Sequence, residues 1–102
     1  MLQFVKNMFG GSSTDYKSLV EKGAVIVDVR TPAEFSGGNI KGSRNIPLNI
    51  LKNKIPELKK SGKPVIAVCA SGARSGMAKA IMQHEGIEVY NGGPWSSLLK
   101  KI

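Results

Sequence analysis

Residues 65–75 read Val-Ile-Ala-Val-Cys-Ala-Ser-Gly-Ala-Arg-Ser, and this stretch decides the fold that we predict. Its first four residues are apolar and rich in β-branched side chains, which is typical of a short strand buried on both faces. Small residues follow, and after Arg74 apolar residues recur at helical spacing, with Ser75 near the expected cap. A strand, a short loop and a helix in this order direct backbone N–H groups and a helix N-terminus at one point. The stretch therefore predicts an anion-binding loop with the thiol of Cys69 at its rim.

Strand and helix patterns alternate through the rest of the sequence. The predicted elements in chain order are a helix at residues 15–22, a strand at 24–29, a helical turn at 31–35, a short strand at 45–46, a helix at 48–60, a strand at 65–68, a helix at 75–86, a strand at 87–90, a turn at 91–94 and a closing helix from 95 onward. This alternation favours an α/β fold, with an open, mainly parallel central sheet and helices on both faces. In parallel sheets ligands gather at the carboxyl ends of the strands, which places Asp28 and Arg30 near the expected site.

Local signals refine two of these elements. Thr31 caps its turn, Pro32 takes the first helical position, and Glu34 completes a capping box. Pro56 is expected to kink the helix at 48–60 or to divide it into two pieces, because proline removes a backbone hydrogen bond.

Four other side chains receive structural interpretations. Met77 and Met82 fall on the apolar side of the helix at 75–86 and are expected in the core. Trp95 is expected to pack rather than to bind substrate. His84, the only histidine, is expected at the surface, and it lacks partner residues for a metal. We expect neither a metal nor a cofactor.

The composition is that of one small globular domain. The 102 residues are 41% hydrophobic, with 12 glycines. We expect a flexible tail over residues 1–13 and a domain over 14–102, with Ser13 or Thr14 capping its first helix. A single cysteine cannot form an internal disulfide, no run is as long as a membrane span, and no secretory signal is recognisable. We therefore expect a cytoplasmic protein with no membrane partner. We also expect a monomer.

The charge is strongly basic, with 15 basic and 7 acidic residues giving a net charge of +8. The lysines are dispersed, and no aromatic residues alternate with them to form a stacking platform, so we expect no nucleic-acid partner. A positive field raises the local concentration of a small anionic substrate, which agrees with the predicted anion-binding loop.

Three motifs occur in one order along the chain. Residues 28–35 read Asp-Val-Arg-Thr-Pro-Ala-Glu-Phe, residues 38–47 read Gly-Asn-Ile-Lys-Gly-Ser-Arg-Asn-Ile-Pro, and residues 69–75 form the cysteine loop. In this combination the sequence resembles the single-domain rhodaneses over about residues 14–100. It departs from them at two places: Asn39 stands where the family usually has histidine, and Trp95 follows the Gly-Gly pair earlier than usual.

The resemblance implies sulfur transfer. Cys69 would attack the outer sulfur of a small anionic donor such as thiosulfate and hold it as a persulfide. An acceptor, either cyanide or a cellular thiol including one on a protein, would then remove it. The thiolate, the persulfide and the leaving anion would be stabilised by the backbone amides of the loop. The loop residues are Ala70, Ser71, Gly72, Ala73, Arg74 and Ser75.

The charged residues around the loop have alternative roles. Arg74 binds either an oxyanion or an acidic residue that orders the loop. For Asp28 an ion pair with a nearby arginine is preferred over direct proton transfer. Arg30 either forms that structural pair or faces the substrate.

Two other classes of function are alternatives to sulfur transfer. Cysteine phosphatases and arsenate reductases carry five residues between the cysteine and the arginine, whereas four separate Cys69 from Arg74 here. A shorter loop suits a smaller reacting group, sulfur rather than phosphorus with its oxygens. Non-catalytic members of the rhodanese family usually lack the cysteine, which this chain retains.

Overall fold

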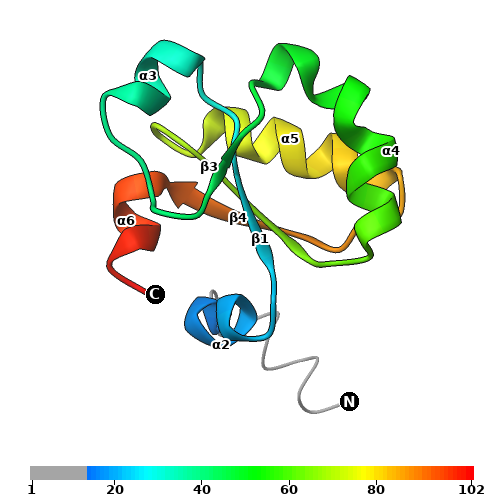
Figure 1. Ribbon diagram of the computed structural model, residues 1–102, viewed down its shortest axis with the longest axis horizontal. Coiled ribbons are helices and arrows are strands. Elements are labelled where there is room, and N and C mark those ends of the chain that lie inside the picture. The colour runs from blue at the N-terminus through cyan, green and yellow to red at the C-terminus, as the bar shows by residue number, and fades with distance from the viewer. Residues whose placement is uncertain (1–13) are drawn as a thin grey trace.

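The computed structural model describes residues 14–102, which form a four-stranded parallel sheet with helices (Figure 1). The strands are β1 (Val25–Asp28), β2 (Arg44–Asn45), β3 (Val65–Cys69) and β4 (Val89–Pro94), in the order β2-β1-β3-β4. The helices are α2 (Tyr16–Glu21), α3 (Pro32–Ser36), the 3₁₀ turn η1 (Leu48–Ile50), α4 (Leu51–Ser61), α5 (Ala73–His84) and α6 (Trp95–Leu99). The predicted α/β fold with an open parallel sheet is confirmed.

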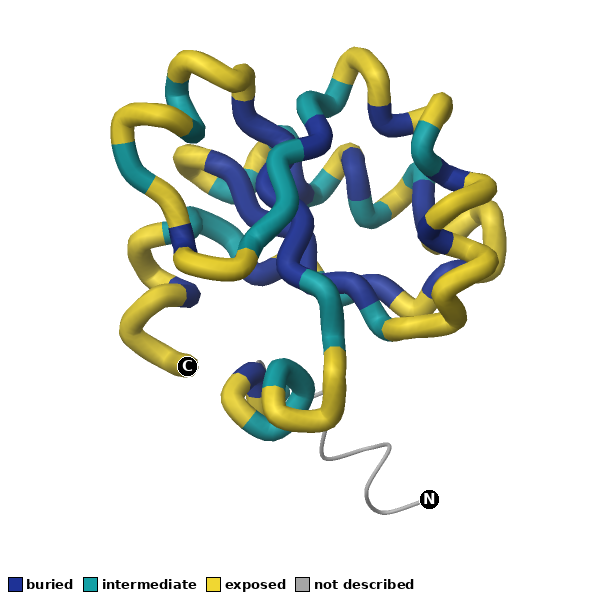
Figure 2. Tube along the Cα trace, viewed as in Figure 1, coloured by how far each residue is buried: buried dark blue, intermediate teal, exposed yellow. Residues whose placement is uncertain are grey.

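Helices cover both faces of the sheet, and β3 shows how the sequence achieves this. Successive side chains of a strand point to opposite faces. Val65, Ala67 and Cys69 pack in a core cluster with α4 and α5, whereas Ile66 and Val68 pack with α2 and α6. All five residues of β3 are buried, and buried positions run along the centre of the trace in Figure 2. The thiol of Cys69 therefore lies on the face covered by α4 and α5.

The first helix is shorter than expected and has a different cap. Asp15 is the N-cap of α2, and its Oδ1 accepts a hydrogen bond from the backbone N–H of Ser18 at 3.0 Å. Thr14 does not cap the helix. Ser13, the other candidate, lies outside the described residues, as does the expected tail over residues 1–13.

The capping box at α3 is confirmed. The backbone N–H of Glu34 donates to the hydroxyl of Thr31 at 3.2 Å, and a carboxylate oxygen of Glu34 accepts from the Thr31 N–H at 3.0 Å. Pro32 occupies the first turn. This turn places Glu34 beside the loop that follows β3.

The helix predicted at 48–60 is divided, but not at Pro56. Its two pieces are η1 and α4, which meet between Ile50 and Leu51. Pro56 lies inside α4. It is exposed, and so is Lys52, whose carbonyl loses its partner in the helix because proline has no N–H. Water can satisfy that carbonyl, so the helix continues.

The end of the sheet differs most from the prediction. The expected turn at 91–94 belongs to β4, which pairs with β3 and has an irregularity in register between Ala67 and Val68. A Cβ added to Gly92 would lie 2.9 Å from a methyl group of Ile66 and 3.0 Å from one of Val68. Gly92 is therefore required by the close approach of β4 to β3 and not by a turn.

Most predictions for single side chains are confirmed, and one is wrong. Met82 is buried, but Met77 is 54% exposed and the prediction for it is wrong. His84 is exposed, as expected, with Nδ1 3.8 Å from a carboxylate oxygen of Glu85. Trp95 packs against the cluster of α2 and α6, as expected.

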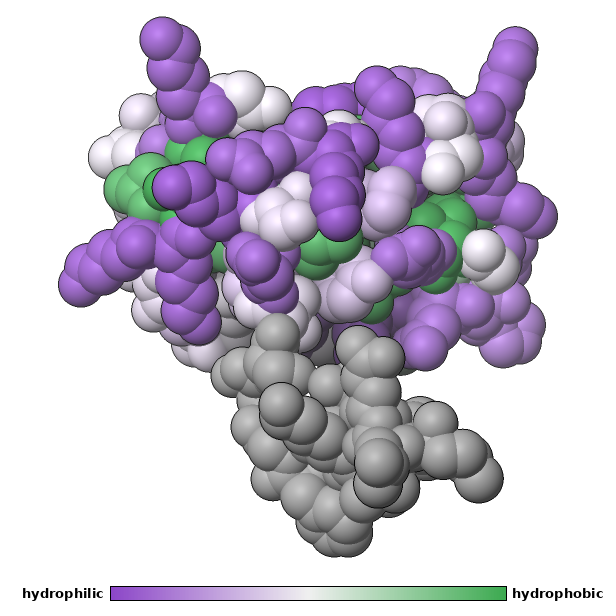
Figure 3. Space-filling model, turned by 90° about the horizontal axis from the view of Figure 1, so that it is seen from below, coloured by the Kyte–Doolittle hydropathy of each residue, from purple (hydrophilic) through white to green (hydrophobic). Residues whose placement is uncertain are grey.

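Hydrophilic residues dominate the face shown in Figure 3, where hydrophobic residues form separate small areas on the part that is coloured. Within residues 14–102, no helix has the length and apolar character needed to cross a membrane.

Candidate functional site

Cys69 ends β3, and the chain after it folds back over the sulfur. Sγ accepts hydrogen bonds from the backbone N–H groups of Gly72 at 2.9 Å and Ser75 at 3.3 Å. The hydroxyl oxygen of Ser75 lies 3.4 Å from Sγ. Cys69 is completely buried, so its thiol lies beneath the loop and not at the rim. Two backbone N–H donors and one hydroxyl group therefore converge on one buried sulfur.

These contacts decide the acidity of the thiol. Burial raises the pKa of Cys69 because it removes water from the charged form. The hydroxyl of Ser75 and the amides of Ser75, Gly72 and Ser71 act in the opposite direction and outweigh burial, so the pKa lies below the usual value of 9.0. The geometry thus favours the thiolate, which is the nucleophilic form.

Gly72 gives the loop its shape. It is the N-cap of α5 and has φ of 104°, a left-handed conformation that residues with a Cβ adopt at a cost. The turn at Gly72 lets α5 begin at Ala73 with Ser75 in its first turn, so Ser75 is not the cap itself. Ala70, Ser71 and Ala73 are exposed. Their side chains bring no charge to the loop.

Asn91, on β4, is a residue of the site that the sequence did not reveal. Its Oδ1 accepts hydrogen bonds from the hydroxyl of Ser75 at 2.7 Å and from the N–H of Gly93 at 2.9 Å. Its Nδ2 donates to the carbonyl of Gly72 at 3.3 Å. Asn91 therefore ties the loop to the last strand. Asparagine next to a Gly-Gly pair indicates a turn, so its sequence context carried no signal of this role.

Asp28 and Arg30 form a buried ion pair at the end of β1. Nε of Arg30 donates to Asp28 Oδ1 at 2.9 Å, and its NH2 group donates to Oδ2 at 2.7 Å. The same NH2 group donates to the carbonyl of Gly38 at 2.7 Å, and the guanidinium carbon lies 4.9 Å from the centroid of the Trp95 ring. The preferred interpretation, an ion pair that orders a loop, agrees with these contacts.

Arg74 is paired with an acidic residue. Its NH1 and NH2 groups donate to the two carboxylate oxygens of Glu34 at 2.7 and 2.9 Å. Hydrogen bonding to Arg74 is the largest cause that lowers the pKa of Glu34 to about 2. Of the two roles proposed for Arg74, the structure contains the loop-ordering pair, which connects α3 to the start of α5.

Asn39, at the position where rhodanese sequences usually have histidine, forms a local bond. Its Nδ2 donates to the carbonyl of Phe35 at 2.8 Å. The substitution is therefore accommodated within the turn that follows α3.

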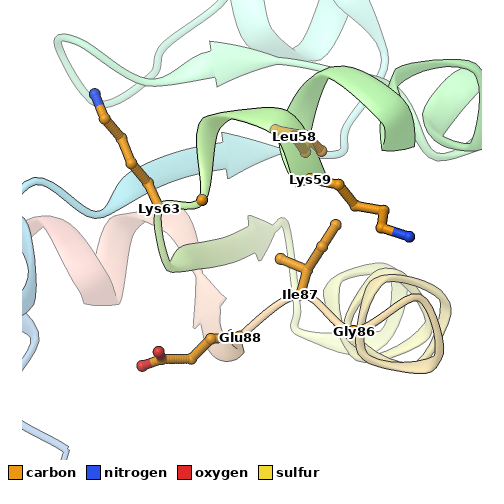
Figure 4. A pocket seen from close by; sticks show the side chains of 7 residues that line it. Leu58, Lys59, Lys63, Gly86, Ile87 and Glu88 are labelled. Atoms are coloured by element: carbon orange, nitrogen blue, oxygen red, sulfur yellow. The ribbon is translucent and has the colours of Figure 1, made fainter.

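A hollow of about 300 Å³ lies at the opposite end of the sheet, near the amino ends of β3 and β4 (Figure 4). Figure 4 shows Lys59, Lys63 and Glu88 extending their charged groups away from one another. Because no polar groups converge there, this hollow is a weaker candidate than the cysteine loop.

Comparisons with known proteins agree with the geometry of the site. A family model described as the rhodanese-like domain matches residues 12–94. The uncharacterized protein YqhL of Bacillus subtilis is 45% identical over 69 residues, which are 67% of this chain and 54% of that protein. Thiosulfate sulfurtransferase GlpE of Stutzerimonas stutzeri is 39% identical over 70 residues, 68% of this chain and 63% of that protein.

A solved structure extends the likeness to the fold. The crystal structure of a rhodanese-related protein from Thermoplasma volcanium superposes with a TM-score of 0.71 at 31% identity, covering 86% of this chain and 90% of that one. The curated relatives named above are longer, and this chain spans little more than half of YqhL. The match over most of the sequence, together with a cysteine loop at the end of a central parallel strand, shows that the chain belongs to the rhodanese-like domain family.

Proposed function

We propose that the protein is a sulfurtransferase, which moves a sulfane sulfur from a donor such as thiosulfate to cyanide or a cellular thiol through a persulfide on Cys69. The observation that carries this proposal is the convergence of two amides and one hydroxyl on Sγ. These donors favour negative charge on sulfur. Relatives whose names include sulfurtransferase, among them GlpE, support the same class of reaction.

The first half of the reaction loads the cysteine. The thiolate of Cys69 attacks the outer sulfur of thiosulfate, a new S–S bond forms, and the S–S bond of the donor breaks. Sulfite leaves with the electron pair of the broken bond. One thiolate and one dianion thus become one persulfide anion and one dianion.

The second half regenerates the thiolate. Cyanide or an acceptor thiolate attacks the outer sulfur of the persulfide, and Cys69 leaves as the thiolate. The sequence has one cysteine, so the chain has no second thiol to discharge the persulfide. We therefore expect a ping-pong mechanism with an isolable intermediate.

Phosphoryl transfer is less well supported. Four residues separate Cys69 from Arg74, and the guanidinium that would bind the equatorial oxygens of a phosphoryl group is bound to both oxygens of Glu34.

Intact mass spectrometry tests the proposal. The protein is treated with thiosulfate or with methanethiosulfonate, excess donor is removed, and the mass is measured before and after adding cyanide. We expect one added sulfur atom that cyanide removes, and no addition in the Cys69→Ser variant. The proposal is wrong if neither donor leaves sulfur on Cys69 under rapid quench, or if Cys69 instead supports hydrolysis of aryl phosphates.

A further inference from the structure

The side chain of Asn91 determines where the hydroxyl proton of Ser75 points. Asn91 Oδ1 accepts a hydrogen bond from the N–H of Gly93 at 2.9 Å, and its Nδ2 donates to the carbonyl of Gly72 at 3.3 Å. Only one orientation of the amide satisfies both contacts. In that orientation Oδ1 faces the hydroxyl oxygen of Ser75 at 2.7 Å. Because Oδ1 carries no hydrogen, the proton of this contact is that of Ser75.

The sulfur of Cys69 is a second neighbour of the same hydroxyl. Sγ lies 3.4 Å from the hydroxyl oxygen, and either atom can be the donor. While the Ser75 proton is bound to Asn91, the hydroxyl accepts from the Cys69 thiol and does not donate to it. The third neighbour, the carbonyl of Gly72 at 3.1 Å, already accepts from the N–H of Gly76 and from Asn91 Nδ2. Asn91 Oδ1 is therefore the main competitor of the sulfur for the Ser75 proton.

The charge on Sγ decides this competition. A thiolate is an ionic acceptor and binds a hydroxyl more strongly than a neutral amide oxygen does. A thiol binds it more weakly, and so does the inner sulfur of a persulfide anion, whose charge lies on the outer sulfur. The hydroxyl of Ser75 changes acceptor by rotating about its C–O bond, so its proton stays on the oxygen throughout. A charge on Sγ thus breaks the hydrogen bond from Ser75 to Asn91.

On the basis of the proposed function, we infer that Asn91 is a positioning residue that holds the Ser75 proton whenever Sγ is uncharged and so favours the persulfide of Cys69 over the thiolate. In loading, the electron pair of the thiolate forms the new S–S bond, sulfite leaves with the pair of the broken bond, and the hydroxyl of Ser75 turns to Asn91. In discharge, the Cys69 thiolate leaves the transferred sulfur and the hydroxyl turns back. Asn91 thereby makes Cys69 a poorer leaving group and retains the sulfur on the enzyme.

The backbone of Asn91 is held independently of its side chain. Asn91 pairs with Ala67 in the sheet, and its carbonyl accepts a hydrogen bond from the hydroxyl of Tyr16 at 3.1 Å. Asn91→Leu keeps the approximate size of the side chain and removes both polar atoms. Asn91→Asp keeps an oxygen that can accept from the hydroxyl of Ser75. These two variants therefore separate the acceptor atom from the strand that carries it.

The equilibrium of the loading step measures the preference for the persulfide. Each protein is mixed with thiosulfate and sulfite at fixed ratios, at a pH above the inflection of its alkylation profile, and intact mass gives the loaded fraction. We expect Asn91→Leu to lower the equilibrium constant about three- to tenfold, which is the net effect of one hydrogen bond, and to speed discharge by cyanide. Asn91→Asp should keep the constant at least as high as in the wild type. Asn53→Leu and Asn53→Asp, at an exposed position of α4, are the matched controls and should leave it unchanged.

The pH dependence of alkylation by iodoacetamide separates positioning from a purely structural role. If the Asn91 side chain only held the loop in place, Asn91→Leu would withdraw donors from the sulfur and raise the pKa of Cys69. The inference requires the opposite, a lower pKa, because the hydroxyl of Ser75 becomes free to donate to the thiolate. The substitutions leave unchanged the paired charges of the site, which are Arg74 with Glu34 and Arg30 with Asp28.

A double-mutant cycle tests whether Asn91 acts through Ser75. In a Ser75→Ala background, Asn91→Leu should change neither the loading equilibrium nor the alkylation inflection. Asn91→Asp provides the same comparison if the leucine variant does not fold, since its inflection should lie above that of the parent by less in the Ser75→Ala background than in the wild type.

The outcomes distinguish this inference from the proposed function. Effects of equal size in the two backgrounds would overturn the inference, and so would an Asn91→Leu variant with an unchanged loading equilibrium or a raised inflection. In each of those cases the wild type still carries sulfur on Cys69, and the proposed function stands. If thiosulfate never loads the wild type, both fail.

Discussion

The sulfur of Cys69 contacts two amides and one hydroxyl, and of these only the hydroxyl of Ser75 is a side-chain group that substitution removes. That hydroxyl is shared, because it also lies 2.7 Å from Asn91 Oδ1 and 3.1 Å from the carbonyl of Gly72. The hydroxyl has one proton, and three acceptors share it. The charge on sulfur therefore competes with two neutral oxygens for the same donor.

We predict that Ser75→Ala raises the pKa of Cys69. The substitution removes a donor that favours the thiolate and leaves burial, which disfavours it, in place. The rate of alkylation by iodoacetamide, followed against pH, should inflect at a higher pH than in the wild type.

Ser97→Ala on the exposed surface of α6 is the control for this measurement. Loss of the Ser75 hydroxyl does not leave Asn91 Oδ1 without a partner, because the N–H of Gly93 still donates to it. An unchanged inflection in Ser75→Ala would show that the backbone amides alone set the acidity of the thiol.

At the scale of elements, β4 approaches β3 so closely at Gly92 that there is no room for a side chain. We predict that Gly92→Ala lowers the free energy of unfolding by about 1–3 kcal/mol, since the added Cβ must displace buried methyl groups of Ile66 and Val68. Urea unfolding measures the change.

Gly37→Ala is the matched control for Gly92→Ala. Gly37 has φ of −75°, and an added Cβ there would be 3.5 Å from its nearest neighbour, so the free energy of unfolding should change by less than about 1 kcal/mol. Equal losses in the two variants would contradict the packing argument.

The pair between Glu34 and Arg74 joins α3 to the start of α5, and its stabilising effect depends on pH. Hydrogen bonds from Arg74 and from the backbone of Thr31 lower the pKa of Glu34 from 4.5 to about 2. A lowered pKa in the folded state stabilises the fold at pH values above 4.5, and the effect disappears as the pH falls from 4.5 towards 2.

We therefore predict that the melting temperature of the wild type exceeds that of Glu34→Gln at pH 6 and that the difference shrinks through this acid range. Differential scanning calorimetry at several pH values measures it. A difference in melting temperature that stays constant down to pH 2.5 would mean that the carboxylate charge does not stabilise the fold.

At the scale of the whole molecule, the net charge of +8 acts on approaching anions. We predict that kcat/KM for anionic sulfur donors falls as ionic strength rises from about 0.01 to 0.2 M, and that it falls more steeply for thiosulfate than for a thiosulfonate with one charge. Alkylation of Cys69 by iodoacetamide, which is neutral, should change little over the same range. A rate that does not depend on salt would show that the dispersed lysines do not attract the donor.

The sequence predicted the parts of the fold whose signals are local. The apolar runs of β1 and β3 and the capping box at Thr31 each lie within a few neighbouring residues. Met77 was misplaced because apolar spacing shows that a helix has an inner face without fixing how wide that face is. The turn predicted around Gly92 was wrong because, in a sequence, a glycine required by close packing cannot be distinguished from a glycine required by a turn.

The site was predicted less completely than the fold, since its contacts join distant parts of the chain. Glu34 was recognised as a capping residue, yet its carboxylate also binds Arg74, 40 positions away. Asn91, on β4, contacts Ser75 of α5, which lies 16 positions earlier in the chain. Only the assembled sheet brings these side chains together, and no short motif contains both members of either pair.

The position of β3 between β1 and β4 has a consequence for how the protein is made. Val25 pairs with Val65, so the first strand of a growing chain has no central partner until the segment that ends in Cys69 has been synthesised. Pairing of such distant segments is a slow, late event in folding. The groups that lower the pKa of Cys69 belong to residues 71–75, which follow this segment, so the thiol of a nascent chain has an ordinary pKa. The pH dependence of alkylation at Cys69 thus reports whether the loop has folded, without any added label.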